Sequence, residues 1–428
     1  MAEYSEYKDS GIPWIGKIPS HWDVKPIRSF LSQSKELNEN ENATLLTLSQ
    51  YKGVNIRNGN EDSAISAAES LVGYNIVHKG QFVMNIMLAW NGSYGVSDYD
   101  GVISPAYAIF NFKNDVCKAY YHYLWRTKAY QDAFKTRSKG IVDSRLRLYP
   151  QYFLPFYTSL PPKEEQEAIV AYLDKVTADI DKAIAAKERI IASLEERRKI
   201  IITHAVTRGI NPDAQLKDSG IDWLGDIPAH WEIRRLKHLI SVPLQYGANE
   251  APDDYNEILP RYIRITDITL DGQLKEDSKV SLLESKANNY ILKKGDILFA
   301  RSGATVGKAY LFNENIRACF AGYLIKARVN NLITPEFLMV YTQSKVYENW
   351  KNFIFNRATI QNIGADKYSN LQLPFPSIEE QHSIIANLNG KLEPIETAIT
   401  QQKKLIELLR ERKNIIINET VTGKVKVI

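Results

Sequence analysis

The chain has 428 residues and 44% of them are hydrophobic, which is enough for two or three domains with cores of their own and excludes a generally disordered chain. Its 54 basic and 50 acidic residues leave a net charge of only +4, so any strongly basic surface must be local. The sequence contains neither a signal-peptide pattern nor an apolar run of about 18 residues. We therefore expect a cytoplasmic protein that does not interact with a membrane.

The cysteines and histidines give no metal or disulfide pattern. Cys117 and Cys319 lie about two hundred residues apart, with no CxxC motif or Cys/His cluster near either. The seven histidines form no HExxH pair, and His21 and His230, each next to a tryptophan, are interpreted as structural hydrogen-bonding residues. We predict no metal ligands and no cofactor on this chain.

A short phrase occurs twice. The sequence KDSGIPWIGKIPSHW at residues 8–22 returns as KDSGIDWLGDIPAHW at residues 217–231. A second repeat matches the segment that begins at Pro161 with the segment that begins at Pro376, over more than forty residues without a gap. The chain is therefore predicted to be a tandem duplication, in which each half has the phrase, a body of about 140 residues and a long charged segment.

The two bodies, residues 23–155 and 232–373, combine short strand-like runs with shorter helical pieces. This pattern predicts an α+β fold for each. The sequences KGQFVMNI, from Lys79, and KGDILFAR, from Lys294, mark a frame that both bodies share. Outside this frame the bodies have little sequence in common, which indicates that they recognise different things while the long segments do one shared job.

The long segments at residues 156–210 and 374–428 are each predicted to contain a helix of about 45 residues, roughly 68 Å long. Their apolar residues follow a spacing that alternates three and four, as in a coiled-coil seam. Lys187, Arg197, Gln402 and Arg412 interrupt this seam. The predicted seam includes Leu173, Val176, Ile180 and Leu194 in the first helix and Leu388, Ile395, Leu405 and Leu409 in the second.

We expect the two helices to pair with each other as an antiparallel coiled coil, because each offers a matching apolar stripe. We also expect the first phrase to anchor the chain start near the end of the second helix, as the second phrase does after the first helix. Two alternatives remain open: each helix folds back onto its own body, or it dimerises with another molecule.

No catalytic constellation is found. The sequence GATVGK, from Gly303, is one residue short of a phosphate loop, and Ala309 stands where that motif has Ser or Thr. The sequence SPAY, from Ser104, differs from the methyltransferase tetrad at Ala106 and comes without a Gly-rich cofactor turn. A loose nuclease outline, Pro252-Asp253 with Glu284, is of a kind that arises by chance in a charged chain. We therefore predict that the chain is not an enzyme.

Basic and amide side chains in both bodies are suited to a nucleic acid. Arginine and lysine can contact phosphates or guanine, and asparagine and glutamine can pair with adenine. A merely solvated basic face is the alternative for each cluster. The predicted DNA-binding residues are Asn85, Asn91, Lys135, Arg137, Lys139, Arg145 and Arg147 in the first body, and Arg301, Ser302, Thr305, Lys308, Arg357 and Gln361 in the second.

The order of these motifs resembles one family. IPSHW and IPAHW precede the bodies, LAWNGSYGVS with SPAY and GDILFARSGATVGK lie within them, LPPKEEQ and FPSIEEQ open the helices, and LEERRKIIITHAVT and LRERKNIIINETVTGK close them. Over nearly its whole length the chain is similar to the DNA-specificity subunits of type I restriction-modification systems.

This resemblance implies a non-catalytic subunit with two target recognition domains joined by two long helices. Each domain would read one half of an asymmetric, bipartite site in double-stranded DNA. The helices would dock two copies of the modification subunit, a methyltransferase that carries S-adenosylmethionine, and a restriction subunit would join the full complex. A coiled-coil protein scaffold without DNA binding is the alternative, and an autonomous nuclease is a weaker one.

The sequence also predicts where these parts begin and end. The divisions are residues 1–22 for the first phrase, 23–155 for the first recognition domain, 156–210 for the first long helix, 211–231 for the second phrase, 232–373 for the second recognition domain, and 374–428 for the second long helix and the C-terminal tail.

Overall fold

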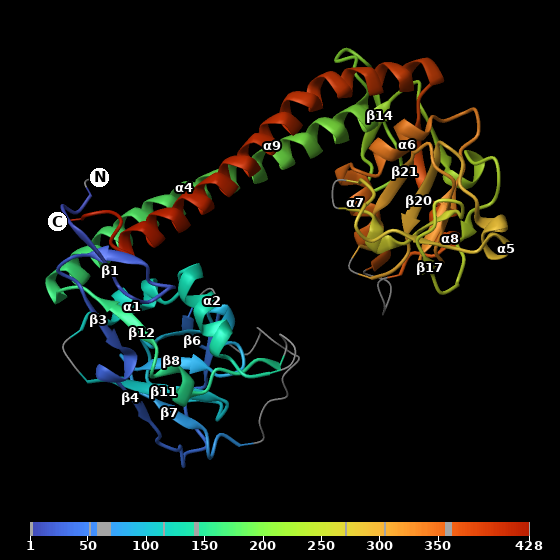
Figure 1. Ribbon diagram of the computed structural model, residues 1–428. Helices are drawn as coiled ribbons and strands as arrows, with labels where there is room; N and C mark the ends of the chain where they lie inside the picture. Colours follow the sequence, from blue (N-terminus) through green and yellow to red (C-terminus); the bar gives the residue numbers. More distant parts are fainter. Residues whose placement is uncertain are drawn as a thin grey trace. The chain divides into compact units, whose positions relative to one another are not determined.

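The long helices of the computed structural model run through both of its compact units. The structure describes residues 3–50, 53–57, 70–113, 116–140, 145–269, 272–303, 305–355 and 362–427. The first unit contains residues 1–186 and 404–428, and the second contains residues 187–403. Each unit therefore holds one phrase, one body and a part of each long helix (Figure 1).

The two phrases fold in the same way. In the first, β1 (Tyr7–Asp9) pairs with β2 (Lys17–Pro19), and in the second β13 (Leu216–Asp218) pairs with β14 (Asp226–Pro228), each time antiparallel. Two glycines in each hairpin have φ between 69° and 72°, a conformation that favours glycine. The repeated sequence thus produces a repeated hairpin.

The first body is built on a four-stranded sheet of order β4-β11-β8-β9, with all of its pairings antiparallel. Two further strand pairs, β5–β6 and β7–β10, lie outside this sheet, and β12 pairs with β3. The elements are β3 (Asp23–Pro26), η1 (Ile27–Ser29), β4 (Leu31–Ser34), β5 (Leu46–Ser49), β6 (Gly53–Ile56), β7 (Asn75–Val77), β8 (Phe82–Asn85), η2 (Ala89–Asn91), β9 (Tyr94–Val96), β10 (Gly101–Ile103), β11 (Tyr107–Phe112), α1 (Lys118–Leu124), α2 (Lys128–Arg137), α3 (Pro150–Phe153) and β12 (Tyr157–Leu160).

The second body repeats this frame with a sheet of order β16-β23-β20-β21 and the pair β15–β24. It differs in its second sheet, of order β17-β19-β18-β22. The elements are β15 (Glu232–Arg235), η4 (Leu236–His238), β16 (Gln245–Tyr246), β17 (Asp253–Asp254), β18 (Arg261–Ile263), η5 (Ile265–Asp267), β19 (Val280–Ser281), α5 (Glu284–Ala287), η6 (Asn288–Tyr290), β20 (Asp296–Ala300), β21 (Ala309–Phe312), β22 (Ala318–Phe320), β23 (Leu324–Ala327), α6 (Pro335–Tyr341), α7 (Lys345–Phe355), α8 (Ala365–Ser369) and β24 (Gln372–Phe375).

The helices α4 (Lys163–Arg208) and α9 (Ile378–Val421) have 46 and 44 residues and run side by side in opposite directions (Figure 1). In the first unit Lys413 of α9 donates to Asp181 of α4 at 2.7 Å. In the second unit Lys187 of α4 donates to Gln402 of α9 at 3.2 Å. As the residue number rises along α4, the number of its partner on α9 falls, which confirms the predicted antiparallel coiled coil. The mixture of helices and strands in both bodies confirms the predicted α+β fold.

One seam position differs from the prediction. Leu173 and Leu388 are buried, but Leu405 is 40% exposed, while its neighbour Ile406 is 6% exposed. A straight α-helix has 3.6 residues per turn, so an apolar stripe with a spacing of 3.5 drifts around it and the buried position moves by one residue. The interruptions Lys187 and Gln402 bond to each other, so they satisfy one another within the seam.

Each phrase is bonded to a glutamate near the start of a long helix, and the two glutamates occupy equivalent positions. Glu165 accepts a hydrogen bond from Trp22 Nε1 at 3.0 Å and shares one with His21 at 2.9 Å. Glu380 accepts from Trp231 Nε1 at 2.8 Å and shares one with His230 at 3.1 Å. The repeated histidine and tryptophan are therefore structural hydrogen-bonding residues.

The first phrase also lies against the end of α9. A side-chain carbon added at Gly423 would come within 2.5 Å of Pro19 and 2.9 Å of Trp22, and the Tyr7 hydroxyl donates to the Lys424 carbonyl at 3.4 Å. Gly209, after α4, faces Trp231 of the second phrase in the same way. The predicted anchoring of the chain start is confirmed. Among the described residues, no helix is both long and apolar enough to cross a bilayer.

Candidate nucleic-acid interface

The turn after the inner strand of each body is held in the same way. In the second body the Arg301 carbonyl, just after β20, accepts from the Ile363 amide at 2.9 Å. In the first body the Ile86 carbonyl, just after β8, accepts from the Leu148 amide, also at 2.9 Å. The connections β20–β21 and β8–β9 therefore occupy equivalent places, and each lies beside the segment that precedes the last strand of its body.

The Arg301 side chain lies against an aromatic ring. Its guanidinium carbon is 5.1 Å from the centre of the Tyr246 ring, and Tyr246 is 42% exposed. The Nε of Arg301 and the Oδ1 of Asn362 are buried and have no hydrogen-bond partner among the residues that the structure describes. Ser302 pairs with Asn362 through a backbone bridge. Arg301, Ser302 and Asn362 thus form one cluster around Tyr246.

Other arginines of this body have carboxylate partners. Arg328 bonds to Asp296, Arg264 to Asp267 and Arg261 to Glu276. These contacts hold positive charge inside the fold. Within the described part of the second body, no ion pair joins Arg301 to a carboxylate, so its charge remains available for an external acceptor.

Lys308 and Thr305 of the second body make contacts with the backbone of their own body. Lys308 donates to the backbone carbonyls of Ile268 and Thr269. The carbonyl of Thr305 accepts from the Lys308 amide at 3.0 Å, which closes the loop. Arg357 and Gln361 lie outside the described residues.

Three of the five predicted cations of the first body lie on aromatic rings. Lys135 is 5.1 Å from the centre of the Trp90 ring, Arg137 is 5.9 Å from Phe156, and Lys139 is 5.3 Å from Tyr152. Lys139 and Arg147 exchange two backbone hydrogen bonds of 2.9 Å, and Arg145, between them, is exposed. The segment therefore presents several positive side chains beside the β8–β9 connection.

The two predicted asparagines of the first body serve the loop itself. Asn85 is 3% exposed, and its side-chain oxygen accepts from the Met87 amide at 3.0 Å. Asn91 accepts from the Ser93 hydroxyl at 3.0 Å. These contacts fix the turn, so the structure does not place the Asn85 side chain where it could meet a base.

Comparison with known proteins gives one consistent result. Residues 228–410 match the sequence model of a family described as the type I restriction modification DNA specificity domain. The MjaVIII specificity subunit of Methanocaldococcus jannaschii is 23% identical over 80% of this chain and 79% of its own length. The EcoBI specificity subunit of Escherichia coli is 29% identical over 62% of this chain and 56% of its own length. These matches confirm the recognition of the chain as a type I specificity subunit: residues 228–410 carry the DNA specificity domain, and the similarity to known specificity subunits extends over most of the chain.

A solved structure supports the fold of this specificity subunit. A chain from a type I R-M system, whose structure was described in terms of complex assembly and conformational transition, superposes with a TM-score of 0.67. It is 14% identical, and the match covers 95% of this chain and 99% of the other. The sequence matches confirm the prediction of a specificity subunit, and such subunits are non-catalytic.

The sequence did not reveal the aromatic partners of the cations. Tyr246 comes before the predicted Arg301 loop by more than fifty residues, and Trp90 and Tyr152 flank the basic segment of the first body from different elements. From sequence alone an aromatic residue is predicted to lie in the core, and only the fold shows which ring is partly exposed. Exposed Met87 and Leu88, at the tip of the β8–β9 connection, were missed for the same reason.

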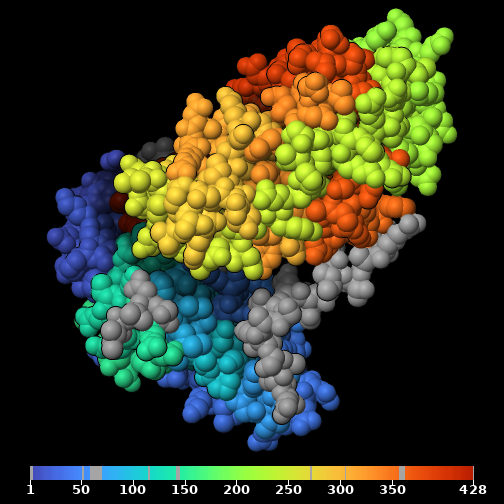
Figure 2. All heavy atoms as spheres, turned by 90° about the vertical axis from the view of Figure 1, so that its right-hand side faces the viewer, coloured from blue at the N-terminus to red at the C-terminus, as the bar shows by residue number. Residues whose placement is uncertain are grey.

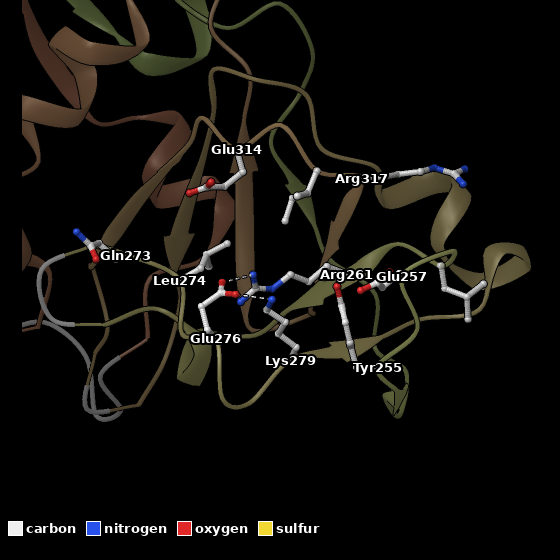
Figure 3. Close-up of a pocket in the computed structure, with 11 residues that line it drawn as sticks. Tyr255, Glu257, Arg261, Gln273, Leu274, Glu276, Lys279, Glu314 and Arg317 are labelled. Carbon is white, nitrogen blue, oxygen red and sulfur yellow. Dashed lines mark hydrogen bonds and ion pairs between the residues drawn. The ribbon is translucent and has the colours of Figure 1, made fainter.

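A cavity of about 540 Å³ in the second body is a weaker candidate. Figure 2 shows this body as a continuous surface, coloured from yellow-green to orange, and Figure 3 shows the cavity lining. Glu276 contacts both Lys279 and Arg261, and these contacts lower the pKa of its carboxyl group (Figure 3). Arg317 is paired with Glu284. Arg261, Lys279 and Arg317 of the cavity therefore each already contact a carboxylate of the chain.

Proposed function

We propose that this specificity subunit reads an asymmetric, bipartite site in double-stranded DNA, with residues 23–155 on one half and residues 232–373 on the other. The observation that carries the proposal is the equivalence of the two turns at Ile86 and Arg301. Each residue accepts the same kind of backbone hydrogen bond, but their side chains differ. One frame with two different reading surfaces suits two different half-sites.

The charges support DNA as the ligand. Cations on partly exposed rings, such as Lys135 and Lys139, are suited to phosphates, because contacts to phosphate position a protein on the duplex. Neutralising phosphates releases counterions, so binding should weaken steeply with salt. A subunit whose bodies must reach the same side of B-DNA should read half-site centres about one turn, or roughly 10 base pairs, apart.

The repeated parts support a repeated partner. Two hairpins, two Glu–His–Trp clusters and two long helices offer one set of surfaces twice, which suits two copies of one modification subunit. That methyltransferase would carry the S-adenosylmethionine, and a restriction subunit would complete the complex. The cytoplasm, where cellular DNA of a prokaryotic host lies, is the compartment that this function requires.

The test is to express the chain with its modification subunit in cells that lack other DNA methyltransferases, and to map methylated bases by long-read sequencing. We expect one motif made of two different half-sequences with an unread gap of fixed length. A control lacking this chain should show no methylated motif. Methylation at a contiguous or symmetric motif would contradict the proposal. Full assembly with the modification subunit but no sequence-dependent DNA binding would instead support a protein scaffold.

A further inference from the structure

The backbone of Arg301 is fixed before any ligand arrives. The residue follows β20, whose five residues are all buried. Its amide donates to the Tyr323 carbonyl at 3.1 Å, and its carbonyl accepts from the Ile363 amide at 2.9 Å. Because the Arg301 backbone donates one hydrogen bond and accepts another, the first atoms of its side chain have little freedom.

The ring beneath the guanidinium is also fixed. Tyr246 lies in β16, which pairs with β23, and the Ala365 amide donates to its hydroxyl at 2.9 Å. A guanidinium stacks flat on an aromatic face, and such a contact is stronger when it is shielded from water. Tyr246 therefore restricts the plane in which the Arg301 donors point.

Polar atoms of this cluster have no hydrogen-bond partner within the described part of the chain. Among the described residues no carboxylate pairs with Arg301, and the buried Nε of Arg301 and Oδ1 of Asn362 are both without partners. A buried polar atom without a partner is uncommon in a native protein, and it can mark the place where a ligand binds. The missing acceptor is expected to come from outside the chain.

A planar guanidinium in a fixed orientation suits a planar acceptor pair. Guanine presents O6 and N7 side by side in the major groove, and bidentate contact by arginine is the commonest specific contact to DNA. A phosphate could accept the same donors but requires no fixed plane. We propose that Arg301, held in place by Tyr246, reads a guanine in the half-site of the second body. This inference rests on the proposed function and deepens it.

The first body could not read the same base in this way. Its equivalent residue is Ile86, which has no donor, and the following Met87 and Leu88 are apolar and exposed. The guanine should therefore occur at this place in only one half of the site. The difference between Arg301 and Ile86 gives the asymmetry of the target a chemical cause.

The experiment uses the complex of this chain with its modification subunit and a DNA library randomised in both half-sites. Wild type should select a guanine that Arg301→Ala no longer selects, with an affinity loss of roughly 5- to 150-fold at that position and no change in the other half-site. Arg301→Lys should restore overall binding more than discrimination, because lysine lacks the bidentate fork.

Two further measurements separate reading from folding. Replacing the guanine by 7-deazaguanine removes N7 without changing the protein, and should weaken wild type but not Arg301→Ala. Tyr246→Phe keeps the ring and should retain discrimination, whereas Tyr246→Leu should lose much of it while the first half-site is still read.

Two outcomes would overturn the inference. One is an Arg301→Ala complex that binds all sequences more weakly to the same extent, which would indicate a phosphate contact. The other is full discrimination by that variant. If wild type itself selects no bipartite sequence, the proposed function fails as well, so the two failures can be told apart.

Discussion

In both bodies a side chain at one equivalent position holds the turn that precedes strand β8 or β20, but the side chain differs. In the second body Asp296 accepts from the Lys293 amide at 2.7 Å and from Arg328 at 2.7 Å twice. In the first body Gln81 accepts from the His78 amide at 2.7 Å and donates to Asn111 at 2.7 Å. The turn is kept, while an ion pair in one body stands where an amide pair stands in the other.

This comparison shows what a duplicated frame preserves. A backbone donor in the turn must find an acceptor, because a buried amide without one is costly. A carboxylate and an amide oxygen serve equally well for that bond, so the remaining side chain is free to diverge. The same separation of backbone and side chain occurs at Arg301 and Ile86.

The largest expected effect comes from removing the Asp296–Arg328 ion pair of the second body. Asp296→Ala leaves Arg328 partly buried without its carboxylate, and the second unit should lose about 3 kcal/mol of unfolding free energy. Gln81→Ala in the first body removes neutral hydrogen bonds and should cost about 1 to 2 kcal/mol. Asp296→Asn, which retains an acceptor for the Lys293 amide, should fall between them. Chemical denaturation of the three variants measures this, and equal losses in both bodies would contradict it.

The second effect is a difference in acid sensitivity. Burial, with a smaller contribution from Arg126, lowers the pKa of His122 in α1 to about 4, from an unfolded value near 6.5. Between these values the unfolded chain binds a proton that the folded chain does not, so stability is complete above pH 6.5 and decreases as the pH falls toward 4. The loss should not exceed about 3 kcal/mol.

The equivalent place in α6 of the second body is Met339, which does not titrate. Unfolding of the first unit should therefore respond more strongly to a change from pH 7 to pH 5 than unfolding of the second, as followed by hydrogen exchange. His122→Met is the matched variant and should remove this part of the response. An unchanged pH profile in that variant would count against the buried neutral histidine.

The smallest effect concerns phosphate contacts. Lys139→Ala should weaken DNA binding by the complex about equally for all sequences and reduce the salt slope by about one. Lys139→Arg should keep the slope. Titrations with specific and random duplexes at several salt concentrations measure both quantities. A change in sequence preference would contradict this prediction, because it would indicate that Lys139 contacts a base, as we propose for Arg301.

The parts of the fold that depend on periodicity were predictable. Repeats, proline and glycine signals and a seam with a spacing of three and four gave both long helices and their antiparallel pairing. The prediction that Leu405 lies in the seam was wrong. In a straight helix the apolar stripe drifts around the axis, and the position of the partner helix decides which residue is buried. The common sheet was visible only at Lys79 and Lys294, because strand pairing depends on backbone atoms that unlike side chains can share.

The candidate site was predictable only as a set of charges. Arg301 and the basic segment of the first body were predicted from local runs of charged residues and stay predictions, whereas Asn85 is buried in its own turn. Tyr246 could not be found, because its contact with Arg301 joins residues far apart in the chain. Sequence shows which groups can bind an anion, whereas the fold decides which of them are already occupied.

The main-chain bonds from Leu148 to Ile86 and from Ile363 to Arg301 also bear on how new targets arise. A loop whose path is set by amides and carbonyls can exchange its outward residues one at a time without refolding. Under the proposed function, single codon changes in such a loop would alter the DNA sequence that the subunit selects, while every other surface of the subunit is inherited unchanged.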